Sequence, residues 1–183
     1  MKEIRIHGRG GQGSVVLAEL LAIAAWEDGK FSQAFPFLGG GGERRGKPIQ
    51  AFTRMDDRLI RLRSRIHHPD YIIVQDCTIL KEVDVLEGLK EQGTVFINTE
   101  RPLSLPDPGG IHWIEIPASK IAMEVMGRPL MNSALLGAFS EMTEEISFPS
   151  IEKAIMKQFS GRVGQQNIEI AKEARAYCRK VKK

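Results

Sequence analysis

The stretch IHGRGGQG, residues 6 to 13, has the residue types and spacing that most directly suggest chemistry. Gly8, Gly10 and Gly13 follow the pattern G-x-G-x-x-G, with a strand-like segment before them and a helical pattern after them. A strand that ends in glycines and opens a helix presents unpaired backbone N–H groups and the positive end of the helix dipole, which together favour a bound anion. The turn therefore predicts an anion-binding cradle.

Every residue of this turn is a candidate for cofactor binding, because glycine lets an anion approach the backbone and the polar side chains add donors. The candidates are Gly8, Arg9, Gly10, Gly11, Gln12 and Gly13. The alternative is structural: the glycines would only permit a tight turn and close packing of the helix on the sheet.

A dinucleotide site requires one further residue, an acid about 20 positions after the turn at the end of the second strand, to bind the ribose hydroxyls. Asp28 has roughly this spacing, but it stands at the end of the expected helix, just before Gly29. The second strand itself ends in Pro36, Phe37 and Leu38. A free-standing oxidoreductase that binds NAD or a flavin is therefore an alternative function that lacks its expected ribose partner.

The segment FLGGGGERRGKP, residues 37 to 48, stands where that acid would be. Its glycines let the backbone lie close to a ligand or to a neighbouring chain. Arg44 and Arg45 can each bind a carboxylate or phosphate through paired hydrogen bonds. Glu43 can orient one of these arginines, and Lys47 adds a further cation. Solvated surface arginines are the alternative, but the flanking glycines favour a functional interface.

Two polar residues, Asn98 and Thr99, follow the strand-like run TVFI at its carboxyl end. Open α/β sheets bind their ligands at this edge, so both residues are candidates for cofactor contacts. A turn closed by side chain-to-backbone hydrogen bonds is the equal alternative. Further along, Asn132 is expected to cap the helix that begins SALLGA.

The apolar pattern predicts strands that alternate with helices. Strands are predicted over residues 2–7, 30–38, 47–55, 70–76, 93–99 and 111–117. Helices are predicted over residues 14–28, 80–92, 118–127, 132–143, 150–159 and 165–181. We therefore expect one α/β domain spanning residues 1–183, with three α/β/α layers and a mostly parallel, Rossmann-like sheet.

Composition limits the chemistry of the chain itself. Its 183 residues are 42% hydrophobic and 27% charged, as in an ordinary soluble domain. Cys77 and Cys178 are far apart and form no C-x-x-C, so this chain alone assembles neither a zinc site nor an iron–sulfur cluster. No Ser/His/Asp arrangement is evident, and no catalytic residue is assigned.

The location and partners follow from charge and hydropathy. The sequence begins without a signal peptide, and no apolar run approaches the ~20 residues that span a bilayer, so we expect a cytoplasmic protein with no membrane partner. Residues 44–65 contain eight Lys and Arg residues and only two acids, but the net charge of the whole chain is only +3. This segment suits phosphates or an acidic partner, and no nucleic-acid partner is expected.

Four motifs in order, GRGGQG, GGERRG, INT and GRPLMNSALLGA, together resemble the gamma subunit of 2-oxoacid:ferredoxin oxidoreductases. That family includes the pyruvate, 2-oxoglutarate and 2-oxoisovalerate enzymes. The likeness extends from Ile4 to the helix that holds Asn167 and Ala171. The chain departs from the family pattern at Leu38 and the glycines after it, and at Lys47, where relatives often have another glycine.

The resemblance implies a subunit of an enzyme that converts a 2-oxoacid and coenzyme A into acyl-CoA and carbon dioxide, with two electrons passed to ferredoxin, or runs in reverse. It places thiamine diphosphate and the iron–sulfur clusters in partner subunits, and it makes alpha, beta and ferredoxin-like delta subunits the expected partners. This chain, inactive in isolation, would contribute to assembly and to coenzyme A contacts. A purely architectural subunit is the remaining alternative.

Overall fold

The computed structural model describes residues 1–37, 45–105 and 109–182. The elements in chain order are β1 (Lys2–Arg9), α1 (Ser14–Glu27), β2 (Phe31–Phe37), β3 (Pro48–Asp56), β4 (Tyr71–Val74), the 3-10 helix η2 (Cys77–Lys81), β5 (Thr94–Asn98), β6 (His112–Ile116), α2 (Ala118–Met126), α3 (Asn132–Thr143), α4 (Phe148–Gln158) and α5 (Gly161–Val181). Every predicted strand is present.

The strands form one six-stranded mixed sheet in the order β2-β3-β1-β4-β5-β6. β1, β4, β5 and β6 run parallel to their neighbours in this series, whereas β3 runs antiparallel to both β1 and β2. The expected α/β fold with a mostly parallel sheet flanked by helices is confirmed. As a result, the carboxyl ends of β1, β4, β5 and β6 meet at one edge of the sheet.

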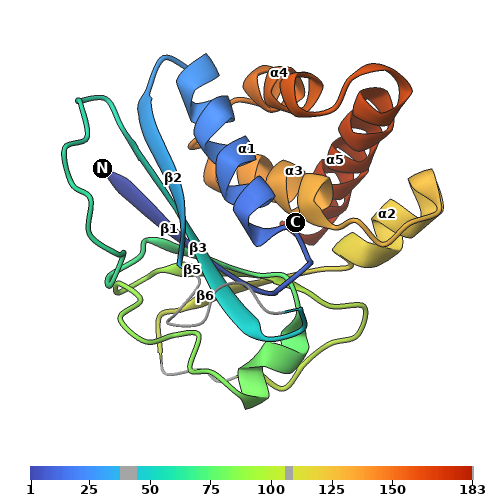
Figure 1. Cartoon of the computed structure of the whole chain (residues 1–183). Helices are drawn as coiled ribbons and strands as arrows, with labels where there is room; N and C mark the ends of the chain where they lie inside the picture. The colour runs from blue at the N-terminus through green and yellow to red at the C-terminus, as the bar shows by residue number, and fades with distance from the viewer. Residues whose placement is uncertain (38–44, 106–108, 183) are drawn as a thin grey trace.

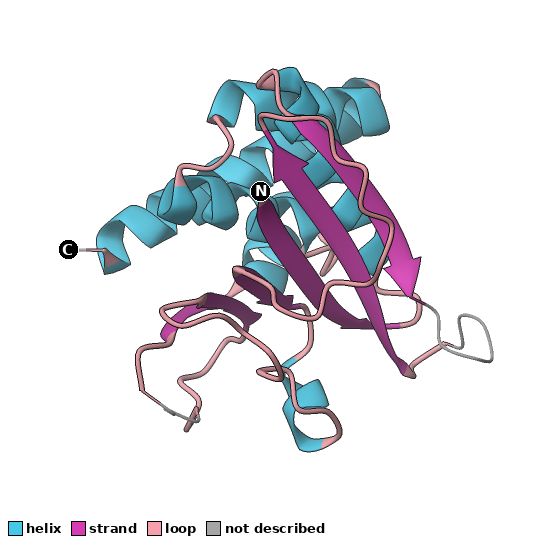
Figure 2. Ribbon diagram, turned by 90° about the vertical axis from the view of Figure 1, so that its left-hand side faces the viewer, coloured by secondary structure: helices cyan, strands magenta, loops and turns pink. Residues whose placement is uncertain are grey.

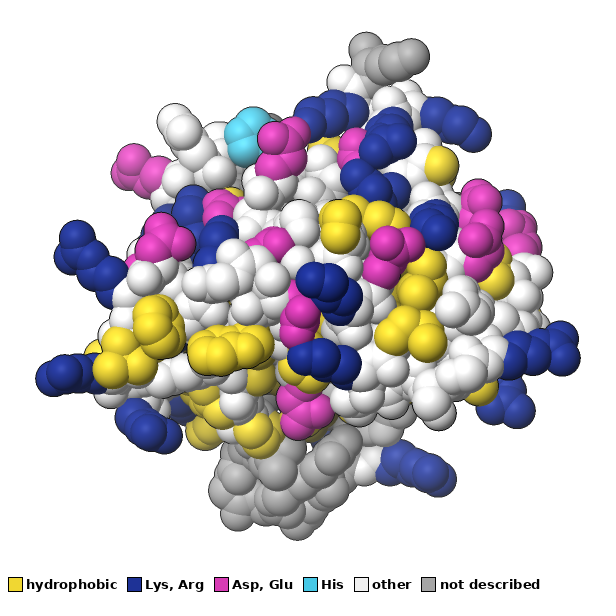
Figure 3. Space-filling model, turned by 90° about the horizontal axis from the view of Figure 1, so that it is seen from above, with side chains coloured by type: hydrophobic (Ala, Val, Ile, Leu, Met, Phe, Trp, Pro, Cys, Tyr) yellow, Lys and Arg dark blue, Asp and Glu magenta, His cyan; other side chains and the backbone are white. Residues whose placement is uncertain are grey.

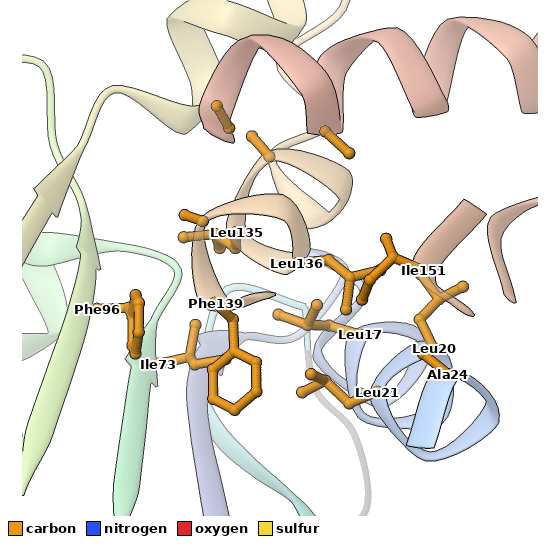
Figure 4. Close-up of a cluster of buried hydrophobic side chains, with 14 of the residues drawn as sticks. Leu17, Leu20, Leu21, Ala24, Ile73, Phe96, Leu135, Leu136, Phe139 and Ile151 are labelled. Carbon is orange, nitrogen blue, oxygen red and sulfur yellow. The ribbon is translucent and has the colours of Figure 1, made fainter. Parts of the chain in front are cut away.

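The helices α1 to α5 pack on one face of the sheet and enclose the larger apolar core (Figures 1 and 2). Alternate residues of the strands point into it, as the two-residue period of a strand requires. Figure 4 shows Ile73 of β4 and Phe96 of β5 beside Phe139 of α3, with Leu17 and Leu21 of α1 next to them. Burial of each such side chain contributes about 1.5 to 3 kcal/mol, so this core holds α1 and α3 against the sheet.

The opposite face of the sheet is covered by η2 and turns, and the helix predicted for residues 80–92 does not form. The apolar residues that suggested it do pack against this face, from turns rather than from an α-helix. They are Leu80, Val83, Leu86 and Leu89. Their spacing therefore correctly predicted burial but not the backbone conformation.

A buried guanidinium explains the missing helix. Arg5 on β1 is 4% exposed, and its Nη2 donates to the carbonyl oxygens of Val85 at 2.9 Å and Glu87 at 2.6 Å. Gly88 follows with a φ of 72°, and a Cβ at this position would lie 2.1 Å from the carbonyl oxygen of His67. The carbonyl groups thus satisfy the arginine, and the backbone turns away from the helical path.

Charges of both signs are interspersed over the face of the molecule seen from above in Figure 3. On α1, Glu27 pairs with Lys153 at 3.6 Å and also with Lys157, both on α4. Because both lysines are exposed, their pairing with the half-buried Glu27 contributes little to stability. The alternation of charges gives this face no single-sign field that would attract a charged ligand.

Two helices pack closely at Gly137 on α3. A Cβ built there would lie 2.3 Å from the carbonyl oxygen of Ala171 on α5, and 2.8 Å from its Cα. Both neighbouring atoms belong to the backbone of a packed helix, so they cannot move away without displacing α5.

We predict that Gly137→Ala destabilises the protein by about 1 to 3 kcal/mol, as expected for overpacking. A loss of stability is informative, because in an isolated helix the same change from glycine to alanine is stabilising by about 1 kcal/mol. Chemical denaturation measures the effect, with Glu173→Ala on the exposed side of α5 as the control. A Gly137→Ala protein as stable as the wild type would contradict the close contact between α3 and α5.

Candidate functional site

The glycine turn between β1 and α1 needs glycine for two different reasons. Gly11 and Gly13 adopt φ values of 94° and 77°, a left-handed conformation that other residues rarely take. Gly8 needs space instead, because a Cβ there would lie 2.2 Å from both Gln75 Oε1 and Ser14 Oγ. These constraints account for Gly8, Gly11 and Gly13 through local structure, whether or not a ligand binds.

The glycine turn and the arginine-lysine motif lie side by side. The Gly10 N–H donates to the carbonyl oxygen of Lys47 at 2.9 Å, and the Gly46 N–H donates to the carbonyl oxygen of Gly10 at 3.0 Å. Arg45 forms a bridge with Gly10 and covers Gly11. The structure thus brings together the two motifs that the sequence singled out. Of the predicted contacts in this segment, Glu43 and Arg44 lie outside the described residues.

Arg9 and Gln12 are held by acids of this same chain. Arg9 Nε lies 3.2 Å from Asp76 Oδ2, and its Nη2 lies 2.6 Å from Glu82 Oε1. Gln12 Nε2 donates to Asp76 Oδ2 at 2.9 Å. Both side chains are predicted ligand contacts, and in this structure their donors tie the turn to Asp76 after β4 and to η2.

Asp76 is a site residue that the sequence analysis missed. It follows β4 at the carboxyl end, so the edge rule that selected Asn98 and Thr99 also applied to it. Burial disfavours its charged form, but hydrogen bonds from Thr78 and Gln12 outweigh this cost and lower the pKa of Asp76 below its usual value. An ionised carboxylate therefore lies directly beneath the glycine turn.

Asn132 anchors the turn rather than capping α3, which corrects the expected role. It is the first residue of α3, and no side-chain cap forms there among the described residues. Its Nδ2 donates to the carbonyl oxygen of Gly13 at 3.0 Å, and its Oδ1 accepts from Gln75 Nε2 at 2.6 Å. The Ser14 hydroxyl completes this network by donating to Gln75 Oε1 at 2.5 Å.

Asn98 and Thr99 line a crevice of about 260 Å³ that Gln12 and Asp76 also line. Asn98 Nδ2 donates to the carbonyl oxygen of Gln75 at 2.9 Å, and its Oδ1 accepts from the N–H of Ser119 at the start of α2 at 3.1 Å. Thr99 Oγ1 donates to the carbonyl oxygen of Arg101 at 2.7 Å. Thr99 thus makes the local turn of the structural alternative, whereas Asn98 bonds to residues more than 20 positions away. A ligand at this edge would have to share these contacts.

Positive and negative charges are separated across the turn. The crevice contains Asp76 and Glu100, which disfavour a bound anion there. On the other side, Arg45 and Lys47 form no ion pair within 4.0 Å to any described residue. In this part of the chain α1 also has no acid in its first turn and no side-chain cap. The electrostatics favour an anion over the Arg45 side of the turn.

The described residues contain no group of at least three His, Cys, Asp or Glu side chains placed to hold a metal ion. None of the helices in this part of the chain is long and apolar enough to cross a membrane.

The chain is similar to known proteins over most of its length. Residues 3–177 match the family model described as pyruvate ferredoxin/flavodoxin oxidoreductase. Pyruvate synthase subunit PorC of Methanocaldococcus jannaschii is 51% identical over 175 residues, which cover 95% of each chain. The pyruvate/ketoisovalerate oxidoreductases common subunit gamma of Thermococcus kodakarensis is 44% identical over 180 residues, again with 95% of each chain covered.

A solved structure has the same fold. The crystal structure of pyruvate oxidoreductase subunit PORC from Thermotoga maritima superposes with a TM-score of 0.81 at 33% identity, covering 96% of this chain and 95% of that one. The similarity extends through both the glycine turn and the helices that support it.

The role of Asp76 is testable through pH. Its folded-state pKa is lowered, so the stability it provides is present above its unfolded-state pKa of about 3.9 and is lost as the pH falls through the folded-state value. We predict that Asp76→Asn is less stable than the wild type at pH 7, and that the two stability curves converge as the pH falls below about 4. Denaturant unfolding at each pH measures this, with the exposed Asp57→Asn as control. Parallel curves down to the lowest pH would contradict the tether.

Proposed function

Because this chain belongs to the pyruvate ferredoxin/flavodoxin oxidoreductase family, we propose that it is the gamma subunit of a pyruvate synthase, a multisubunit 2-oxoacid:ferredoxin oxidoreductase. The assembled enzyme oxidatively decarboxylates pyruvate with coenzyme A to acetyl-CoA and carbon dioxide and reduces ferredoxin, or runs in reverse. Relatives that match over 95% of this chain and 95% of their own length support this assignment. The single domain over residues 1–183 and the cytoplasmic location are part of the same proposal.

In this proposal the redox chemistry takes place in other subunits. Thiamine diphosphate and the iron–sulfur clusters belong to alpha, beta and ferredoxin-like delta partners, and coenzyme A is the only cofactor that this chain contacts. No catalytic residue is assigned to it. Its contribution is to hold two features at one edge of the sheet, the cations that lie beside the glycine turn and the crevice lined by Asn98 and Thr99.

The coenzyme A contact rests on one observation, the backbone pairing of Gly10 with Gly46 and Lys47. This pairing brings the backbone of Lys47 to the turn that opens α1, and the Arg45 side chain lies beside Gly11. In our proposal a phosphate bound there gains from both cations and from the helix dipole. The chemistry of these donors fits the phosphate groups of coenzyme A. Arg44 extends the same set by its position in the sequence, and Asn98 and Thr99 remain candidates for the opposite side of the turn.

The alternatives predict different properties. A free-standing NAD or flavin enzyme would bind its dinucleotide without partners, and an architectural subunit would tolerate loss of the cations. Asp76 is an acid in direct contact with the turn, but Thr78, Gln12 and Arg9 already hydrogen-bond to its oxygens. This arrangement supports the gamma-subunit assignment over the dinucleotide one.

Purification from the native source tests the assembly. We expect the chain to elute in a complex with larger subunits that contain thiamine diphosphate, because the proposed active site lies outside this chain. Mass spectrometry of the complex identifies the partners. Recovery of a stable single protein that binds NADH, with no thiamine-containing partner, would overturn the gamma-subunit proposal.

Kinetics of the assembled enzyme test the coenzyme A contact. We predict that Arg44→Gln, Arg45→Gln and Lys47→Gln together raise the KM for coenzyme A roughly tenfold or more, because charge-assisted phosphate contacts contribute about 1.5 kcal/mol or more each. The KM for pyruvate should stay the same. Arg61→Gln, which removes an exposed cation away from the turn, is the control. An unchanged KM for coenzyme A in the triple variant would favour the architectural alternative.

A further inference from the structure

A second candidate site lies on the sheet face opposite to α1 to α5. Residues 57–66 cross this face as an extended segment, here called the strap, which is the teal loop on the side of the sheet away from α1 in Figure 1. Gln33 Nε2 of β2 donates to the carbonyl oxygen of Ile60 at 3.0 Å, and Arg54 Nη2 of β3 donates to that of Arg65 at 3.4 Å. β2 thus holds the strap at Ile60, and β3 holds it at Arg65.

A cavity of about 220 Å³ opens beside the end of the strap. The strand register places Phe37 of β2, Gln50 of β3 and His7 of β1 in one row across the sheet, and all three line the cavity. Arg65 of the strap is also in the lining, and its guanidinium carbon lies 4.0 Å from the centre of the Phe37 ring. The cavity therefore has a buried end at His7 and an exposed cation at its mouth.

His7 presents a hydrogen-bond donor with no partner among the described residues. The ring is 2% exposed, and its Nε2 accepts from Arg5 Nε at 3.0 Å. A nitrogen that accepts a hydrogen bond carries no proton, so the proton of the neutral ring is on Nδ1. Burial and the charge of Arg5 lower the pKa of His7 to about 3, so the ring is neutral at physiological pH. Among the described residues, Arg54 Nη1 is the only buried side-chain nitrogen or oxygen without a partner, so His7 Nδ1 is accessible from the cavity that its ring lines, and a ligand there can accept its hydrogen bond.

The charges around the cavity favour an anion. Arg65 at the mouth and Arg5 behind His7 are both cations, and no Asp or Glu is among the described residues that line the cavity. Glu3 is paired with Arg54, whose Nε lies 2.9 Å from Glu3 Oε1. Glu87 and Asp84, the two acids that act on Arg5, are not among the residues that line the cavity. A compact anion would therefore enter a region of positive potential.

The remaining walls are apolar. Phe37, Ile49 and Val83 line the cavity together with Pro48. The volume is smaller than that of sites for drug-sized ligands, which begin at about 300 Å³. The cavity thus combines cationic and N–H donors at one side with room for only a short hydrocarbon group.

We propose that this cavity is a binding site for a small carboxylate. The carboxylate group hydrogen-bonds to His7 Nδ1–H and to the Gln50 amide and pairs with Arg65, while its short apolar chain packs on Phe37, Ile49 and Val83. This site does not depend on the coenzyme A contact or on assembly with partner subunits.

NMR titration of the full chain with isobutyrate tests the proposal. We expect saturable shifts of the His7 ring nitrogens and of the Gln50 side-chain amide, with a dissociation constant in the millimolar range. Isobutyramide, which has the same shape but no charge, should bind roughly tenfold or more weakly, because charge-assisted hydrogen bonds are about twice as strong as neutral ones. Equal binding of the two compounds would overturn the carboxylate assignment.

Variants locate the site. Arg65→Gln should weaken isobutyrate binding roughly tenfold, whereas Arg63→Gln, on the same strap but outside this cavity, should leave it unchanged. His7→Phe removes the Nδ1–H donor and should abolish binding. His7→Phe also removes the nitrogen that accepts the Arg5 hydrogen bond. Gln50→Leu is therefore the second variant, because it removes the other proposed donor and keeps the Arg5–His7 hydrogen bond. If no saturable shift appears, or if Arg63→Gln weakens binding as much as Arg65→Gln, the proposed site is wrong.

Discussion

The side chain of Gln75 is the constraint on which the arrangement of the site depends. Its carboxamide belongs to a residue only 1% exposed, accepts from the Ser14 hydroxyl at 2.5 Å and donates to Asn132 Oδ1 at 2.6 Å. Its backbone carbonyl accepts from Asn98 Nδ2 at 2.9 Å. An unpaired amide at such a position would cost several kcal/mol, so all of these partners have to be in place together. The side chain of this residue, which directly follows β4, thereby fixes the starts of α1 and α3 and fills the space that a side chain at Gly8 would need, while its backbone carbonyl holds the end of β5.

The strands could be predicted from the sequence because burial on both faces leaves compact apolar runs such as YIIV at residues 71–74. Their order could not. Nothing within residues 48–56 indicates that β3 runs antiparallel between β1 and β2, since pairing depends on other strands. The helix predicted for residues 80–92 was wrong for a related reason. Apolar spacing shows which side chains are buried, whereas the carbonyl of Val85 is bound by Arg5, 80 positions earlier in the sequence.

Residue types allowed part of the candidate site to be selected in advance. Glycine indicates close approach of the backbone, and Arg45 and Lys47 indicate charge, so both motifs were found, but their mutual contact depends on the fold. The error at Asn132 came from a rule that considers only neighbouring residues, because the Gly13 carbonyl that it binds is 119 positions away. Asp76 was missed although it stands at the carboxyl end of a strand, where the rule that selected Asn98 also applies.

The sheet order explains why a dinucleotide-like turn occurs here without the expected ribose partner. In a dinucleotide site the acid ends the strand next to β1 and so lies close to the turn. Here β3 separates β2 from β1, so the end of β2 at Phe37 is two strand spacings from the turn, about 10 Å. The space beside the turn is taken instead by the backbone of Gly46 and Lys47, where the chain enters β3. An acid placed at the end of β2 would be too far away to share a ribose with the turn, whereas cations placed just before β3 are brought directly to it. The inserted antiparallel strand therefore changes the charge that the turn presents, from a carboxylate suited to hydroxyl groups to arginine and lysine side chains suited to phosphate.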